Sequence, residues 1–357
     1  MGLPEINIEF KGQATSAVSR SSQGIVALIL RDTTNSLLNS SLEYKSIEEV
    51  KKVDFTSGNY GHIERAFLGS PSKVIVEVLK LDTETPEKVD VAIKRLKSKR
   101  WNYLAFPEAT EEEKTAIVTF ITTERSENNK SFKAVLANKN ANHEGIIDFV
   151  TDGIQVGEET FTAAEYTTRI AGILAGLPFT RSATYYVLNE VESIIESETP
   201  NEDIDEGKLI LVNDGESIKI GRGVNSLVTP GEGQTDDFKK IKIIEVMDLI
   251  KSDIRETFDK NYVGKVPNTY DNQVLFFAAV NAYLKTLEND ELLDPTYENV
   301  ASVNVNAQRA AWESAGTDTT DWDDAKVKNM TFKSNVFAAG NIKIVDATED
   351  LDFSITI

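Results

Sequence analysis

The sequence contains no cysteine and only two histidines among its 357 residues. Without cysteine the chain forms no disulfide, binds no metal through thiolates and has no thiol nucleophile. The histidines, His62 and His143, stand far apart without the spacing of metal ligands or of a catalytic pair. A lone histidine is usually structural or exposed, so we interpret both in that way and expect no metal site built on them.

Long apolar runs are also missing. A membrane-spanning helix needs about 20 consecutive apolar residues, and the longest candidates, 25–30 and 274–284, are too short or too interrupted. The first ten residues have neither the basic start nor the apolar centre of a signal peptide. We therefore expect no membrane insertion, and the absence of cysteine fits synthesis in the cytoplasm.

Basic residues are scarce relative to acidic ones. The chain has 38 Lys and Arg against 58 Asp and Glu, a formal net charge of −20. This balance argues against direct nucleic-acid binding, which needs a basic surface. Acids gather in 190–206, where eight occur without a base, and in 288–325, where ten occur with Arg309 alone. We interpret both stretches as solvated loops and helix faces, whose repulsion opposes premature association.

Motifs for catalysis are missing as well. Gly221-Arg222-Gly223 looks like the start of a dinucleotide-binding loop, but the third glycine is absent and Ser226 is present instead. No phosphate-binding G-x-x-x-x-G-K-[ST] loop and no G-x-S-x-G nucleophile elbow occurs. Asp321, Asp323 and Asp324 are oxygen ligands of the kind that calcium prefers, but no EF-hand loop surrounds them, so a solvated turn is the better interpretation.

One cluster of basic residues remains to be explained. Phosphate binding is one interpretation; the other is that the cluster ends a predicted helix, where cations complement the helix dipole. The acidic balance of the chain favours the second interpretation. The cluster consists of Lys94, Arg95, Lys97, Lys99 and Arg100.

Because motifs for catalysis and for cofactor binding are missing, we expect a structural protein that is not an enzyme and needs no cofactor and no metal.

The first half of the chain alternates apolar runs with helical patterns. Continuous apolar runs, typical of strands covered on both faces, occur at 25–30, 74–79, 103–106 and 132–137. This alternation predicts an α/β fold with a mostly parallel sheet and helices on its faces. The helical patterns lie at 47–53, before Leu68, at 84–99 with a start at Thr85-Pro86, and from a capping box of Thr110 and Glu113 to Ser126.

The second half predicts helices first and strands later. Helical patterns cover 163–175 and, after Pro178, 183–195. Asn213-Asp214-Gly215 between two short apolar runs predicts a β-hairpin, and the loop 230–234 marks a boundary between lobes. One long helix then runs through Met247, Ile250, Ile254 and Phe258, another runs through Val274, Phe277, Asn281 and Leu284, and strands follow around Val303 and at 330–332 and 342–345.

Both ends of the chain show the strict alternation of a half-buried strand. Such strands need partners, because unpaired edges promote aggregation. They either pair within their own subunit or add to the sheets of neighbouring subunits, which would make the chain a subunit of a polymer. The apolar positions are Ile6, Ile8 and Phe10 at the N-terminus and Leu351, Phe353, Ile355 and Ile357 at the C-terminus.

Most of the chain, and most densely the part from residue 207 onward, resembles the tail sheath proteins of contractile phages. The resemblance is closest to the sheaths of PBSX-type defective prophages and of diffocin-like contractile bacteriocins. The segments that carry it are GKLILVNDG at 207–215, IGRGVNSL at 220–227, FKKIK at 238–242, VMD at 246–248, DIRETF at 253–258, NYVGKVPN at 261–268, NIKIVDA at 341–347 and EDLDF at 349–353.

The resemblance implies a particular domain plan. It consists of a central subtilisin-like α/β sheath domain that is not a protease, a C-terminal α+β domain and extended terminal β-strand arms. Larger relatives insert a β-sandwich after the strand at 74–79, an insertion that looks absent here because only 80–87 precede the next helix. The implied regions are an N-terminal extended arm at 1–22, the α/β sheath domain at 23–235, the C-terminal sheath domain at 236–335, and the C-terminal strands with the donated arm at 336–357.

The function that the resemblance implies is mechanical. Family subunits form sixfold rings around a tail tube, exchange terminal strands with their neighbours, and contract to drive the tube through the target cell envelope. The implied partners are further copies of the chain, the tail tube protein, and baseplate and tail terminator proteins. The implied location is a phage tail or an extracellular phage-tail-like particle assembled in the bacterial cytoplasm. Because the lobe after residue 236 faces the tube in the family, we predict that Lys251 and Arg255 contact the tube.

Two alternatives remain open. One is an α/β hydrolase or nucleotide-binding enzyme whose site has no recognisable motif, and the other is a different tail assembly protein that uses terminal strands. Electron microscopy of the purified protein distinguishes a sheath from an enzyme. Striated hollow cylinders would support a sheath, whereas discrete particles with substrate turnover would support an enzyme.

Overall fold

The computed structural model describes residues 24–33, 41–81 and 87–356. Internal contacts divide the chain into two compact units. We call residues 22–248 together with 346–357 the α/β unit, and residues 249–345 the C-terminal unit. Within the described ranges, no helix has both the length and the hydropathy that a membrane crossing requires.

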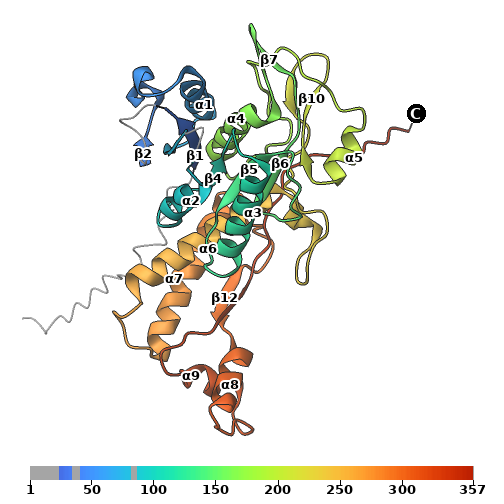
Figure 1. Ribbon diagram of the computed structural model, residues 1–357. Helices are drawn as coiled ribbons and strands as arrows, with labels where there is room; N and C mark the ends of the chain where they lie inside the picture. The colour runs from blue at the N-terminus through green and yellow to red at the C-terminus, as the bar shows by residue number, and fades with distance from the viewer. Residues whose placement is uncertain (1–23, 34–40, 82–86, 357) are drawn as a thin grey trace, which may run out of the picture. The chain divides into compact units, whose positions relative to one another are not determined.

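A seven-stranded sheet forms the centre of the α/β unit (Figure 1). Its strand order is β2-β3-β1-β4-β5-β6-β9, and every neighbouring pair is parallel except β2 with β3. This arrangement confirms the predicted mostly parallel sheet. The strands are β1 (Ile25–Asp32), β2 (Ser41–Tyr44), β3 (Lys73–Lys80), β4 (Tyr103–Ala105), β5 (Lys133–Ala137), β6 (Ile146–Phe149) and β9 (Lys208–Leu209).

Helices cover both faces of this sheet. Val26 and Leu28 of β1 belong to one core, which also contains apolar residues of α1 (Ser57–Phe67) and α4 (Ala163–Gly176). The alternate residues Ala27 and Ile29 belong to the opposite core with α2 (Val89–Lys97) and α3 (Glu111–Ser126). Burial on both faces explains why the central strands are continuous apolar runs rather than alternating ones.

Capping residues determine where two of these helices begin. Thr110 and Glu113 form the predicted capping box of α3, and Thr162 with Glu165 forms a second one at α4. Each box satisfies two backbone N–H groups that the helix itself leaves unpaired. The helical pattern at 47–53 forms two 3₁₀ turns instead of an α-helix, Ile47–Glu49 and Lys52–Asp54. The predicted start of α2 at Thr85-Pro86 lies outside the described residues.

The predicted helix at 183–195 is wrong. This segment forms turns and isolated bridges. Tyr185 and Leu188 donate backbone hydrogen bonds to Ile220 and Ile218, and Gln155 donates one to Ser193. These partners far along the chain override the helical pattern, because they engage backbone groups that a helix would pair internally. The hairpin at 213–215 is confirmed. The elements here are β7 (Ile154–Val156), β8 (Glu159–Phe161), α5 (Pro200–Asp205), β10 (Leu211–Asn213) and β11 (Ile218–Ile220).

The C-terminal unit is built on two long helices. A 3₁₀ turn at Asp236–Lys239 precedes α6 (Ile241–Asn261), which begins in the α/β unit and continues into the C-terminal unit. α7 (Tyr270–Asn289) packs against its second half through the rings of Phe258, Tyr262 and Phe276. Both helices confirm the predicted ones. The unit also contains β12 (Val300–Val303), α8 (Val305–Ser314), α9 (Asp324–Asn329) and β13 (Ala338–Asn341).

Two predicted strands of this unit are misplaced. Residues 330–332 form no strand; Phe332 makes a single bridge to Asn335 and packs its ring against Trp312 and Phe337. Residues 342–345 also form no strand, apart from one bridge between Ile344 and Leu293. The strand forms instead at Ala338–Asn341, whose small residues show no apolar alternation. Pairing with β12 decides its position, because register depends on the partner.

Close packing of α1 on α4 depends on glycine. A methyl group at Gly172 would overlap the backbone of Ala66, whereas a methyl group at Gly58, in the first turn of α1, would meet no atom within 4 Å. We expect Gly172→Ala to destabilise the α/β unit by at least about 1–3 kcal/mol through overpacking. The matched variant Gly58→Ala should be neutral or stabilising by up to about 1 kcal/mol. Urea denaturation of both variants measures this, and equal effects would contradict the packing argument.

Candidate functional site

The C-terminal segment is anchored to the α/β unit by its acidic residues. Asp346 forms an ion pair with Lys240. The Glu349 carboxylate accepts hydrogen bonds from Ser182 Oγ at 2.8 Å and Thr184 Oγ1 at 2.6 Å. Hydrogen bonding to Asp346 raises the pKa of Lys240, so the lysine is firmly charged at neutral pH. The base of the segment is therefore held in place on its own subunit.

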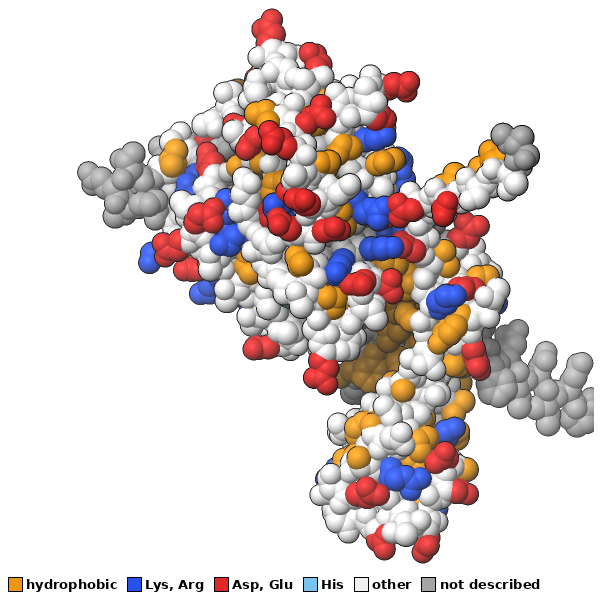
Figure 2. Space-filling view, turned by 90° about the vertical axis from the view of Figure 1, so that its right-hand side faces the viewer, with side chains coloured by type: hydrophobic (Ala, Val, Ile, Leu, Met, Phe, Trp, Pro, Cys, Tyr) orange, Lys and Arg blue, Asp and Glu red, His pale blue; other side chains and the backbone are white. Residues whose placement is uncertain are grey.

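Beyond this anchor the apolar side chains are not covered by any of the described residues. Arg222 pairs with Asp350 at 2.5 Å, and residues 351–356 then belong to no strand. Leu351 is 88% exposed, and Phe353 and Ile355 are each 73% exposed. Figure 2 shows these apolar side chains on the projecting end of the α/β unit, and Figure 1 marks the terminus. Ile357, and the N-terminal Ile6, Ile8 and Phe10, lie outside the described residues.

A candidate acceptor for such a segment lies in the C-terminal unit, on the sheet formed by β12 and β13. The two strands pair antiparallel, with Ala301 opposite Gly340. The outer side of β12 is capped, because Ala301 donates to Asn281 Oδ1 at 2.7 Å and accepts from Asn281 Nδ2 at 3.1 Å. All four residues of β13 are exposed, and among the described residues no strand follows β13 in the sheet. The open edge of this sheet is therefore β13.

An apolar groove runs beside this edge. It has a volume of about 270 Å³ and lies between α6, α7 and the two strands. A strand added to β13 would place every second side chain in this groove. The groove is lined without any charged side chain, by Ile250, Ile254, Phe276, Phe277, Val280, Leu284, Val300, Ala301, Ala338, Ala339, Gly340 and Ile342.

The two predicted tube contacts lie one turn apart on α6. Lys251 and Arg255 are spaced i,i+4 and thus share a helix face. The Arg255 side chain is 47% exposed, and its Nε lies 3.8 Å from a carboxylate oxygen of Asp259. The structure therefore brings the two cations together on one face of the C-terminal unit, while their contact with a tube stays a prediction.

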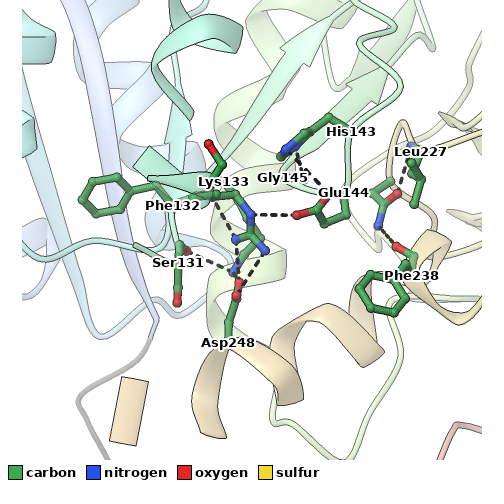
Figure 3. A network of polar contacts seen from close by, with 12 residues as sticks. Ser131, Phe132, Lys133, His143, Glu144, Gly145, Leu227, Phe238 and Asp248 are labelled. Atoms are coloured by element: carbon green, nitrogen blue, oxygen red, sulfur yellow. Dashed lines mark hydrogen bonds and ion pairs between the residues drawn. The ribbon is translucent and has the colours of Figure 1, made fainter. Parts of the chain in front are cut away.

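Sequence analysis missed a buried ionic cluster in the α/β unit. Lys133 of β5 and Arg125 of α3 meet at Asp248 of α6, with distances of 2.8 Å and 2.9 Å to Asp248 Oδ2 (Figure 3). Glu245 lies 3.0 Å from Lys133 Nζ, and Glu144 lies 3.2 Å from Arg125 Nε. The only sign of this cluster in the sequence is a charged residue inside each of two otherwise apolar patterns. These residues are Lys133 in a buried strand and Asp248 in α6.

The cluster keeps its members charged despite burial. Burial alone would raise the pKa of Asp248, but Lys133 and Arg125 outweigh it and lower this pKa to about 2. Burial likewise opposes the charge of Lys133, yet Asp248 and Glu245 raise its pKa. Paired in this way, Asp248, Lys133 and Arg125 fix α6 against the sheet, which supports a structural role for the cluster.

The other acidic, basic and histidine side chains singled out in the sequence have structural roles. Asp323 caps α9 by accepting from the backbone N–H of Lys326. Lys94, Arg95 and Lys97 occupy the last turn of α2, as predicted, and Arg95 pairs with Glu77. Burial lowers the pKa of His62 to about 4, so this histidine is neutral at physiological pH. Within residues 24–33, 41–81 and 87–356, no three His, Asp or Glu side chains converge in a way that would hold a metal ion.

Comparison with solved structures identifies the fold. The anti-feeding prophage (AFP) helical sheath in the contracted state matches with a TM-score of 0.71 at 14% identity, over 100% of this chain and 99% of that one. The sheath tail protein from Desulfitobacterium hafniense matches with a TM-score of 0.70 at 14% identity, over 85% and 94%. The fold is therefore that of sheath proteins.

Sequence comparison then identifies the family. Residues 82–226 match the phage tail sheath protein central domain, and residues 233–357 match the phage tail sheath C-terminal domain. The tail sheath protein of Clostridium phage phiCD119 is 38% identical over 99% of both chains. The phage-like element PBSX protein XkdK of Bacillus subtilis is 25% identical over 53% of this chain and 43% of its own. The chain belongs to the phage tail sheath family, which confirms the resemblance seen in the sequence.

The ionic cluster predicts a specific dependence of stability on pH. Asp248→Asn leaves two buried cations without their shared anion, so we expect a loss of about 3–5 kcal/mol at pH 7. Because the folded pKa is depressed to about 2 from a usual 3.8, the contribution of Asp248 is complete above about pH 4 and is lost as pH falls toward 2. The difference in the free energy of unfolding between variant and wild type should therefore stay constant from pH 7 to pH 4 and decrease below pH 4.

Denaturant unfolding at several pH values measures this gap. Asp236→Asn is the matched control, because the Asp236 side chain is 84% exposed in its pair with Lys239. Exposed pairs contribute little, so the control should be close to wild type. Equal losses in the two variants, or a gap that stays constant down to pH 2, would contradict this account of the cluster.

Proposed function

We propose that this chain is the structural subunit of a contractile tail sheath, which polymerises as sixfold rings around a tail tube and contracts to drive the tube through a cell envelope. One observation carries the proposal: a single chain has both an anchored arm with exposed alternating apolar residues and an open strand edge beside an apolar groove. A surface and its complement on the same chain favour assembly with further copies. The family membership supports the same function.

Strand donation is the proposed contact between subunits. The arm of one copy adds to β13 of another by β-augmentation. Burying each large apolar side chain of the arm contributes about 1.5–3 kcal/mol, while ordering each residue costs about 1–2 kcal/mol. These two terms are similar in size, so one arm binds weakly by itself. A ring presents several acceptors at once, and the resulting effective concentration makes the lattice stable.

Several finer points also remain proposals. The tail tube, the baseplate and a tail terminator are the further proposed partners; AFP structures described as a baseplate and as a helical sheath share this fold. The proposed location is a phage tail or phage-tail-like particle, assembled in the bacterial cytoplasm. We propose no enzymatic activity and no cofactor. The regions 1–22, 23–235, 236–335 and 336–357 are the proposed functional division of the chain.

Removing the arm tests the proposal directly. Deletion of residues 351–357 should leave a folded subunit, because the described residues of this segment make no strand and are exposed. The truncated subunit should form no sheath, since the donated strand is missing. Circular dichroism and electron microscopy measure the two outcomes. Cylinders formed by the truncated protein, or its outright unfolding, would show that the arm is not donated.

Charge reversal tests the proposed tube contact. Lys251→Glu with Arg255→Glu should weaken co-sedimentation of the sheath with tubes most strongly at low salt. The difference from wild type should shrink as salt rises, because exposed charges are screened within about 10 Å at 0.1 M salt. The matched control is Lys45→Glu with Lys51→Glu, an equal charge change at two exposed positions of the α/β unit. Similar co-sedimentation by both double variants across a salt series would refute the assignment of Lys251 and Arg255.

A further inference from the structure

A second apolar cavity lies in the C-terminal unit next to the acceptor groove. Its volume is about 430 Å³, and the end of α6, the start of α7 and residues 333–336 line it. Three aromatic rings, those of Phe258, Tyr262 and Phe276, form one wall with centroids 5.1–5.8 Å apart. The lining contains one cation, Lys333, and no acid. Such a cavity suits an aromatic ring.

Gln273 supports one wall of this cavity from below. Its side chain is 2% exposed, and its Nε2 donates to Asn268 Oδ1 at 2.8 Å. Asn268 also lines the cavity, so this hydrogen bond holds part of the wall in place. The Oε1 of Gln273 is buried and accepts no hydrogen bond from the described residues.

The cavity continues the groove beside β13. Phe276 lines both, and residues 333–336 of the cavity wall lead along the chain into β13. β13 with its flanking residues, 336–342, would span about 20 Å at roughly 3.3 Å per residue, and seven arm residues would span a similar length once they form a strand. A strand paired with β13 therefore reaches from the groove to the cavity.

The arm contains one group that fits the aromatic wall. Phe353 is the only aromatic residue between 338 and 357, and it is 73% exposed on its own subunit. Ring pairs at this spacing are stabilised beyond the burial of their area.

We propose that the aromatic cavity of Phe258, Tyr262 and Phe276 seats Phe353 of a second copy of this chain. This proposal rests on the proposed strand donation to β13 and adds a residue that sets the register of the strand. A one-residue slip would turn every side chain of the arm to the other face. A seated ring prevents that slip, so each arm engages its acceptor in one position.

Photo-crosslinking in assembled sheath tests the seat. Phe353 is replaced by p-benzoyl-phenylalanine, which keeps the aromatic ring, and adducts between copies are mapped by mass spectrometry after irradiation. We expect adducts in 258–276 and 333–336. The matched control carries the same residue at Val53, which is 85% exposed in the α/β unit, and should give none there.

The adduct map separates the two levels of the proposal. Adducts confined to the groove residues 250–254, 280–284 or 338–342 would overturn the seat and leave strand donation to β13 intact. Adducts outside the C-terminal unit would overturn both. If the larger ring prevents assembly, p-azido-phenylalanine at position 353, which keeps a ring close to the original size, gives a second map. Absence of adducts in 258–276 and 333–336 in assembled sheath would also overturn the seat.

Substitution of the ring gives an independent measurement. Phe353→Leu keeps an apolar strand but removes the ring, so the subunit concentration needed for sheath formation should rise about three- to tenfold. Ile355→Leu, a swap in the same arm without a change of chemistry, should leave it unchanged. An equal response of the two variants would contradict a specific seat for Phe353.

Discussion

Ionic contacts around the start of α6 are the interaction on which much of the α/β unit depends. Asp248 neutralises two cations, Lys133 and Arg125, that are buried against the sheet and the flanking helix. Just before the helix, Lys240 holds Asp346 at the base of the C-terminal segment. Buried charges of this kind are tolerated only when they are paired. The same short stretch therefore fixes a helix to the sheet and determines where the terminal arm leaves the subunit.

The arm and the β13 edge are both incomplete within one chain. An exposed alternating segment is unfavourable because its apolar side chains remain in water. An open sheet edge is unfavourable because its backbone N–H and C=O groups lack partners in the sheet. Neither defect can be removed by further folding of the described residues, because the arm base is pinned by Glu349 and Asp350. In the proposed strand donation, association with other copies removes both defects at once. The weak binding proposed for a single arm suits a lattice whose subunits must change their arrangement while staying connected.

Sequence reasoning found the local features of the fold and missed those that depend on distant partners. The capping box at Thr110, the buried runs and the Asn-Asp-Gly hairpin are short-range signals, and all are confirmed. The segment expected to be a helix at 183–195 forms turns and isolated bridges instead, because Ile218 and Ile220 accept two of its backbone hydrogen bonds. The strand expected at 342–345 forms at Ala338–Asn341, because β12 pairs with that stretch.

The sequence by itself determined the α/β class, the family and the identity of the arm residues, since each depends on residue type and spacing along the chain. Only the tertiary structure decided where the arm is anchored, which sheet edge is open and which cavity lies beside it. Asn281 caps Ala301 from a different helix, and Gln273 is left without a donor by its surroundings. Such relations arise from contacts between segments far apart in the chain, and local periodicity carries no information about them.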